Sequence, residues 1–249
     1  MKFERIKRRL GWAGAVWAAG WWPLGLVAAD AAGEGGVSPT VADDFRVGLA
    51  KWVVEQQLGG TVEARDGVLR IDDRGGCTVW LRQPLRAPLR IRYLVTVRGG
   101  RRDAETRGPS DLNCFWMATD PRGGAGEAGF FAADKTGRDG SFASYDGLRT
   151  YYVGYGGNHN TTTRFRRYDG AGARPLLPEH DLGEPRHLLD EGREYRIEIT
   201  VAADGRTTWA RDGEVLFDYA DPEPLREGWF GLRTVWARLE VREFVVERL

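Results

Sequence analysis

The chain has 249 residues, with 36 basic and 36 acidic side chains, two cysteines and three histidines. This balance disfavours a general nucleic-acid or anionic-membrane binder, because such proteins carry an excess of basic residues. The few cysteines and scattered histidines give no zinc-ligand spacing, and the sequence contains no Gly-rich phosphate loop, G-x-S-x-G or H-E-x-x-H motif.

The first 29 residues have the layout of a secretory signal peptide. A basic start precedes an apolar run from Leu10 to Ala29, which contains Pro23 and ends in small residues suited to a signal peptidase. The run approaches the length of a membrane span, so an anchor is the alternative. Removal of residues 1–29 takes away five basic residues and one acidic residue, which leaves 31 basic and 35 acidic residues. We therefore expect a secreted or periplasmic protein with a flexible tether at residues 30–40 and no membrane association after signal removal.

Short alternating segments separated by turn signals fill the chain from Val41 onward. "DGVLRID", "LRIRYLVTV" and "EYRIEITVA" are examples, and no internal repeat or long helical period occurs. Period-two patterning bounded by D-G and Gly/Pro clusters predicts one all-β domain over residues 41–249, an antiparallel β-sandwich. Two long irregular segments, Gly99–Pro109 and Asp120–Gly140, are expected to act in binding or gating. Cys77 and Cys114 form one disulfide or remain two buried thiols, and the sequence leaves both open.

The order of motifs resembles the concanavalin A-like lectin/glucanase superfamily. The C-terminal third contains a D-G hairpin, then "DPEPLREG" and "GWFGLRT", and further upstream stand "DDF", "GLAKWVVE", "SDLNCFWMATDP" and "YYVGYGGNHNTTTRFRRY". The resemblance implies a jelly-roll β-sandwich in an exported bacterial family of unknown function associated with the breakdown of pectin and rhamnogalacturonan. It also implies a polysaccharide or oligosaccharide as partner. Many folds of this type hold a structural calcium ion, to which Asp43 and Asp44 could contribute; no other cofactor or metal is expected, and we expect a monomer.

The stretch "RTYYVGYGGNHNTTTRFRRYDG", residues 149–170, combines aromatic and basic residues in one predicted hairpin with its turn at Gly157–Asn160. Val153 and Phe165 are expected in the core. Alternation then places on the groove side Tyr152, Gly154, Gly156, Arg164, Arg166 and Tyr168. Tyrosine rings stack on sugars and guanidinium groups bind carboxylates. An ordinary hairpin with cross-strand aromatic pairs is the alternative, and a one-residue bulge would exchange Tyr152 for Tyr151 and Tyr155.

The strand in "SDLNCFWMATDP" has two alternative phases. If Leu112, Cys114 and Trp116 pack inward, Asn113, Phe115 and Met117 face the groove, whereas the opposite phase exposes Trp116 as a stacking platform. An amide in an apolar strand needs a partner, which makes Asn113 a candidate binding residue. In "GWFGLRT", alternation places Arg233 on the face opposite Phe230 and Leu232.

The residue inventory favours β-elimination over glycoside hydrolysis. Related glucanases carry paired acids in an E-x-D-x-E strand, and this sequence has no such run. β-Elimination needs an amide or arginine to neutralise a carboxylate and a histidine or tyrosine to transfer protons. We predict His159, Tyr152 and Tyr155 as catalytic residues, and as substrate-binding residues Asn113, Trp116, Arg164, Arg166, Tyr168 and Arg233. A non-catalytic lectin-like binding module and a glycoside hydrolase of the same fold are the alternatives.

Overall fold

The computed structural model describes residues 40–99, 101–102, 105–106 and 108–249. The expected signal peptide and all of the expected tether except Thr40 lie outside these residues. Part of the predicted loop Gly99–Pro109 lies outside them as well.

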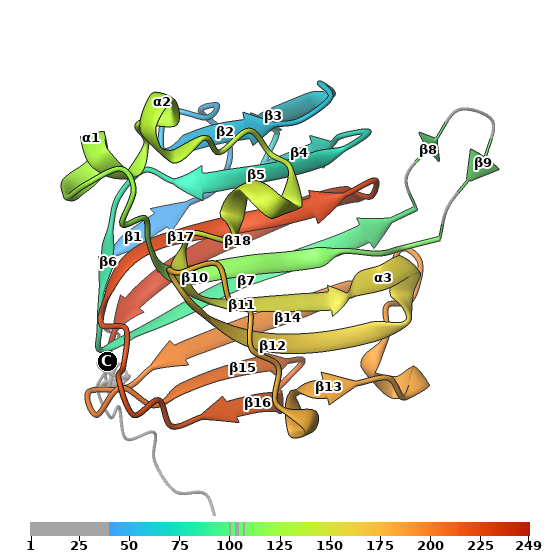
Figure 1. The fold of residues 1–249 in the computed structure, drawn as a ribbon. Coiled ribbons are helices and arrows are strands. Elements are labelled where there is room, and N and C mark those ends of the chain that lie inside the picture. Colours follow the sequence, from blue (N-terminus) through green and yellow to red (C-terminus); the bar gives the residue numbers. More distant parts are fainter. Residues whose placement is uncertain (1–39, 100, 103–104, 107) are drawn as a thin grey trace, which may run out of the picture. The chain divides into compact units, whose positions relative to one another are not determined.

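Two antiparallel sheets of eight strands each, sheet A and sheet B, form a sandwich (Figure 1). In spatial order, sheet A contains β16 (Glu214–Tyr219), β15 (Thr207–Arg211), β14 (Glu194–Val201), β7 (Leu89–Arg98), β18 (Arg238–Arg248), β4 (Val68–Asp72) and β3 (Thr61–Arg65), with β1 (Val41–Asp43) paired to β18. Sheet B contains β13 (Asp181–Leu182), β12 (Thr162–Asp169), β11 (Arg149–Gly156), β10 (Leu112–Thr119), β17 (Glu227–Val235), β5 (Gly76–Leu81) and β2 (Trp52–Gln56), with β6 (Leu85–Arg86) paired to β17. The predicted all-β sandwich is therefore confirmed.

The remaining elements are short. They are the strands β8 (Arg101–Arg102) and β9 (Glu105–Thr106), the helices α1 (Gly126–Phe130), α2 (Ala133–Thr136) and α3 (Gly157–Asn160), and the 3₁₀ turns η1 (Phe142–Tyr145), η2 (Pro178–His180) and η3 (Pro185–His187). Among the described residues, no helix has the length and apolar character that a membrane crossing requires.

The main core lies between the two sheets and follows the period-two pattern of the strands. In β14, for example, Tyr195, Ile197 and Ile199 are buried while the residues between them are more exposed. Sheet B contributes Val153 and Phe165 to the same core, so the predicted phase of the hairpin is confirmed. Full burial of each such side chain stabilises the fold by about 1.5–3 kcal/mol.

A second apolar cluster lies on the outer face of sheet B. Rings on five strands form it, namely Trp80, Phe115, Tyr152, Tyr168 and Trp229. Residues 120–148, which we call the covering segment, carry α1, α2 and η1 (Figure 1). This segment packs Phe130, Tyr145 and Leu148 onto these rings. The predicted loop at Asp120–Gly140 is thus part of a cover over one half of this face.

Arg138 fastens the covering segment to the sheet. Its fully buried guanidinium donates to Glu55 Oε1 at 3.0 Å, to Asp120 Oδ2 at 2.8 Å and to the Phe130 carbonyl at 2.5 Å. Glu55 Oε2 also accepts from Trp80 Nε1 and from the Tyr145 hydroxyl, both at 2.8 Å. These buried charges are therefore paired and hydrogen-bonded, as buried ions must be.

The two cysteines are free and buried. Cys77 lies on β5 and Cys114 on β10, and β17 runs between these strands. Two strand spacings separate the cysteines by roughly 10 Å, which is too far for a disulfide. Burial raises the pKa of each thiol to about 12, so both remain protonated apolar side chains.

Asp43 and Asp44, the aspartates considered for calcium, accept hydrogen bonds from residues near them in the fold. Asp43 Oδ1 accepts from the Phe45 backbone N–H and Oδ2 accepts from Trp52 Nε1, both at 2.8 Å, and Asp44 accepts from the backbone N–H of Arg46. Across the part of the chain that the structure describes, no three His, Cys, Asp or Glu side chains gather in a group able to hold a metal ion.

Candidate functional site

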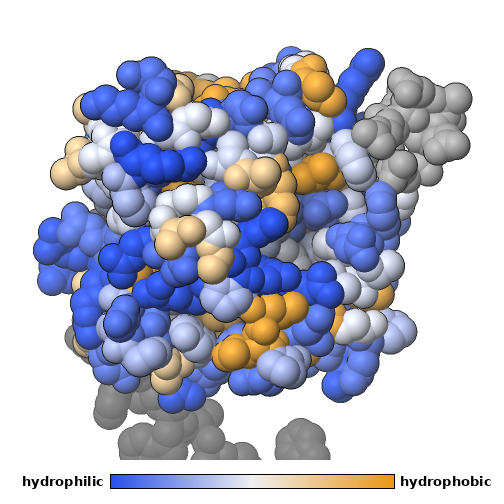
Figure 2. All heavy atoms as spheres, in the orientation of Figure 1, coloured by the Kyte–Doolittle hydropathy of each residue, from blue (hydrophilic) through white to orange (hydrophobic). Residues whose placement is uncertain are grey.

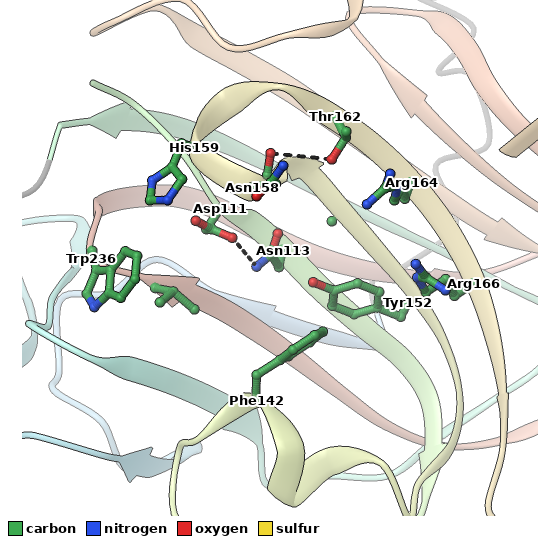
Figure 3. A pocket seen from close by; sticks show the side chains of 13 residues that line it. Asp111, Asn113, Phe142, Tyr152, Asn158, His159, Thr162, Arg164, Arg166 and Trp236 are labelled. Carbon is green, nitrogen blue, oxygen red and sulfur yellow. Dashed lines mark hydrogen bonds between the residues drawn. The ribbon is translucent and has the colours of Figure 1, made fainter. Parts of the chain in front are cut away.

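A groove of about 370 Å³ occupies the part of the outer face of sheet B that the covering segment leaves open (Figure 3). Strands β10, β11 and β12 form its floor, and the connections around them form its walls. Its lining residues are Asp111, Asn113, Phe142, Tyr152, Gly154, Gly157, Asn158, His159, Thr162, Arg164, Arg166, Val235 and Trp236.

The centre of the floor is a glycine between two polar side chains. Gly154 on β11 is in register with Arg164 on β12 and with Asn113 on β10. Residues in register on neighbouring strands share a face of the sheet, and the missing side chain at Gly154 leaves a recess between the other two. A Cβ atom at Gly154 would lie 2.9 Å from the Tyr152 hydroxyl oxygen, so the Tyr152 ring leans over this recess.

Aromatic rings form two walls of the groove (Figure 3). Phe142 of the covering segment packs against Tyr152 with ring centroids 5.8 Å apart. His159 and Trp236 stack on each other at 5.7 Å with an interplanar angle of 19°. Flat apolar faces of this kind suit the C–H faces of a sugar ring.

Asp111 and Asn113 form an acceptor-rich side of the groove. Ser110 Oγ donates to Asp111 Oδ2 at 2.8 Å, and Asn113 Nδ2 donates to Asp111 Oδ1 at 3.3 Å. Burial raises the pKa of the Asp111 carboxyl above its ordinary value, while these hydrogen bonds and the charges of Arg233 and His159 oppose the rise. Asn113 is 1% exposed, and its Oδ1 accepts no hydrogen bond from the described residues.

Arg164 and Arg166 form a basic side of the groove on β12. Arg164 makes a two-pronged ion pair with Asp181, with N–O distances of 2.8 and 3.0 Å. Arg166 donates instead to the backbone carbonyl of Arg174, and no acidic side chain of the described residues pairs with its charge. Hydrophilic residues predominate over this face of the molecule, and its apolar patches are small and separate (Figure 2).

The turn that carries His159 has an unusual backbone. Asn158, His159 and Asn160 all have positive φ values, of 52°, 59° and 60°. Asparagine tolerates this conformation, and Asn160 is further fixed because its amide exchanges two hydrogen bonds with the backbone of Leu189. The asparagines therefore have structural roles in this turn. His159 shares their left-handed conformation, and its ring stacks on Trp236 at the wall of the groove.

Tyr152 combines burial with access to the groove. The side chain is 6% exposed, and burial raises the pKa of its hydroxyl well above the ordinary value. The Tyr152 ring also belongs to the second apolar cluster, where it packs against Phe115 at 5.0 Å. The hydroxyl therefore stays protonated at neutral pH in a fixed position beside the recess.

The structure brings together five of the nine predicted site residues. Along the groove lie Asn113, Tyr152, His159, Arg164 and Arg166.

Trp116 and Tyr155 lie on the opposite face of sheet B, which corrects the expectation that they contact a ligand. Both are 0% exposed in the core between the sheets. Trp116 Nε1 donates to Thr207 Oγ1, and the Tyr155 hydroxyl donates to the Leu188 carbonyl, each at 3.0 Å. The reason is the strand alternation: Tyr155 shares its face with Val153. Met117 also turns into this core, because a bulge with φ of 52° interrupts β10 there.

Tyr168 and Arg233 lie on the predicted face but are covered, which is the second correction. Tyr168 is 0% exposed in the second apolar cluster. Arg233 is also 0% exposed, and its Nη1 donates to Thr78 Oγ1 at 3.0 Å and to the Gly140 carbonyl at 2.8 Å. Its guanidinium lies 5.3 and 4.9 Å from the ring centroids of Phe142 and Tyr145. The covering segment thus separates Arg233 from the groove. The charge of Arg233 still lowers the pKa of Asp111 from a distance.

Lining residues missed from the sequence include Asp111, Phe142 and Trp236. Asp111 lies two positions before Asn113, so strand alternation could have predicted that both side chains point to the same side. Asp111 itself precedes the first residue of β10 and has a φ of 55°. Phe142 follows the irregular segment, and Trp236 follows β17 with φ of 62°. Neither of these two stands in a periodic pattern that would predict its direction.

Comparison with solved structures supports the fold class. A Bacillus subtilis protein of unknown function with a galectin-like fold is similar at 16% identity and a TM-score of 0.63, over 84% of this chain and 96% of that one. A β-1,3-1,4-glucanase (lichenase) derived from a mouse hindgut metagenome is similar at 14% identity and a TM-score of 0.51, over 84% of this chain and 98% of that one. The carbohydrate recognition domain of Emp46p, as a Y131F mutant, gives 12% identity and a TM-score of 0.52, over 80% and 88%. At such identities the likeness concerns the fold alone.

Sequence comparison identifies a family. No curated protein matches the chain. Residues 71–244, well over half of the chain, match the family described as a domain of unknown function, DUF6250. The matched range contains every lining residue of the groove. The chain therefore belongs to the DUF6250 family.

Proposed function

We propose that the protein binds an acidic saccharide in the groove and cleaves it by β-elimination. The observation that carries this proposal is Arg166, a guanidinium held by the Arg174 carbonyl in a groove with aromatic walls and paired with no acidic side chain of the described residues. A fixed cation beside flat apolar rings suits a sugar ring that bears a carboxylate. The galectin-like fold is also one that carbohydrate-binding domains and a glucanase share.

The proposed chemistry assigns a role to each side of the groove. Arg166 neutralises the carboxylate of the bound uronic acid, which acidifies the proton on the neighbouring ring carbon. His159 takes that proton, the electron pair forms a carbon–carbon double bond, and the bond to the leaving glycosidic oxygen breaks. Tyr152 donates its proton to this oxygen, a task for which a hydroxyl with a raised pKa is suited because it stays protonated.

Hydrolysis is less well supported by the groove. It commonly needs two carboxyl groups on either side of the scissile bond. Among the described residues that line the groove, Asp111 is the only one with a carboxyl group. A binding module without catalysis needs only the rings and the arginines, so turnover has to be tested separately from binding.

The experiment measures binding and products on the same panel of uronic-acid polymers. Arg166→Ala should weaken binding at least about tenfold, since hydrogen bonds to charged groups contribute about 1.5–3 kcal/mol. Arg65→Ala, on the exposed β3 of sheet A, is the matched control. Wild type should release products with the ultraviolet absorbance of an unsaturated sugar, and His159→Ala should not. Unchanged binding by Arg166→Ala would refute the site, and binding without any turnover would leave a binding module.

A further inference from the structure

Hydrogen-bond donors and acceptors are segregated across the groove. The guanidinium groups of Arg164 and Arg166, which only donate, project from β12. Asp111 and Asn113 lie at β10 on the other side of Gly154. The two sides are separated by two strand spacings, roughly 10 Å, and Gly154 leaves a recess between them.

The orientation of Asn113 is fixed by Asp111. An ionised carboxylate only accepts hydrogen bonds, so the amide nitrogen of Asn113 must face Asp111 and its Oδ1 must face away. This oxygen is buried and accepts no hydrogen bond from the described residues. A buried acceptor without a donor is costly, and Asn113 lines the groove (Figure 3). A ligand donor at this place would remove the cost.

Asp111 offers further acceptor capacity at the same place. Each of its carboxylate oxygens accepts one hydrogen bond, from Ser110 or from Asn113, and retains a lone pair. No arginine or lysine of the described residues forms an ion pair with it. The acceptor oxygens of Asp111 and Asn113 thus lie side by side and can accept hydrogen bonds from the hydroxyl groups of a ligand. An anionic group of the ligand would be repelled there.

We infer that Asp111 and Asn113 bind free hydroxyl groups of the saccharide unit whose carboxylate lies against Arg166, so that the groove selects acidic saccharides with unsubstituted hydroxyls. This inference rests on the proposed function and adds the direction in which the sugar lies. Its carboxylate points to β12 and its hydroxyls point to β10. Acetylation of those hydroxyls removes the donors and leaves Asn113 Oδ1 buried without a partner.

The test compares free and O-acetylated forms of the same oligosaccharide by isothermal titration calorimetry. Oligogalacturonate and oligoalginate serve as probes, each with its hydroxyls free or acetylated. Wild type should bind the free form at least about tenfold more tightly, the effect of one lost hydrogen bond with a buried acceptor. In Asp111→Asn this preference should fall towards one. Asparagine is the suitable replacement because it tolerates the positive φ of position 111.

Two further variants complete the design. Asn113→Leu removes the buried acceptor by a second route and should also lose the preference. Asp134→Asn, an exposed position on α2, is the control and should keep it. Equal affinity of wild type for free and acetylated probes would overturn the inference while the proposed function stands, and so would a preference retained in both groove variants. If wild type bound no acidic probe in either form, the proposed function itself would fail.

Discussion

Replacement of Gly154 by alanine tests the recess with a single methyl group. The Cβ atom would lie 2.9 Å from the Tyr152 hydroxyl oxygen, 3.2 Å from its Cε1 and 3.3 Å from its Cζ. Since real Cβ atoms do not approach other atoms so closely, the Tyr152 ring must shift. The backbone conformation of residue 154 is one that any residue adopts, so the effect comes from contact and not from chain strain.

The expected loss of stability is small. Overpacking at a buried ring costs about 1–3 kcal/mol, and the replacement of a glycine recovers about 0.4–1 kcal/mol through the unfolded state. A net loss of about 0–2.5 kcal/mol lowers the Tm of a chain of this size by at most about 10 °C. Ligand binding should suffer more, because the methyl group fills the recess and moves the Tyr152 hydroxyl at the same time.

The assay measures thermal unfolding and binding of an acidic oligosaccharide in parallel. Gly154→Ala should remain folded and bind at least about tenfold more weakly, the effect of one displaced hydrogen-bonding group. Gly183→Ala is the control, since its added Cβ would lie 3.7 Å from the Thr161 carbonyl oxygen, an ordinary contact. Wild-type affinity in a folded Gly154→Ala protein would show that no ligand approaches this glycine, and the groove assignment would then be wrong.

Two further predictions concern stability. Arg138→Met leaves Asp120 and Glu55 without a shared cation, and it should lower the free energy of unfolding in urea by about 3–5 kcal/mol; a loss under about 1 kcal/mol would contradict the fastening role. Burial among Phe165 and other rings lowers the pKa of His180, and the nearby Glu179 opposes this. The neutral form is therefore favoured on folding, so this stability is present above about pH 6.5 and is lost as the pH falls through the lowered pKa. Between about pH 6.5 and about pH 5, His180→Gln should lose less stability than wild type, and equal losses would exclude His180 as the cause.

The sequence predicted which side of β11 and β12 faces the groove, because alternation alone decides this, whereas it left two phases open for β10. Val153 and Phe165 are in the core, and Tyr152 and Arg164 are on the other side. The error over Tyr155 came from including a residue of the core phase among the catalytic candidates. Alternation failed only at Met117, where one extra residue in β10 reverses the direction of the side chain.

Exposure could not be predicted in the same way, because it depends on the covering segment. Tyr168 and Arg233 have the same phase as Arg166, yet both are fully buried. The Gly140 carbonyl and the Phe142 ring cover the Arg233 guanidinium. Both belong to the covering segment, whose sequence has no strand or helix periodicity. No pattern in the strands themselves distinguishes a residue under such a segment from one beside it.

The boundary between the covered and the open half of the face runs through Tyr152. Its ring packs on Phe115 in the covered cluster, while its hydroxyl lies beside Gly154 in the groove. Phe115 is in register with Gly231, and Tyr152 is in register with Arg166. Gly154 is in register with Asn113 and Arg164, and Asn113 is in register with Arg233. On β10 and β11, the change from the rings of Phe115 and Tyr152 to Asn113 and Gly154 occurs within one two-residue step along the strands. A buried polar atom without a partner among the described residues, such as Asn113 Oδ1, is explained by a polar ligand or by solvent. This placement is the physical reason to look for the substrate at Gly154, beside the covering segment and not beneath it.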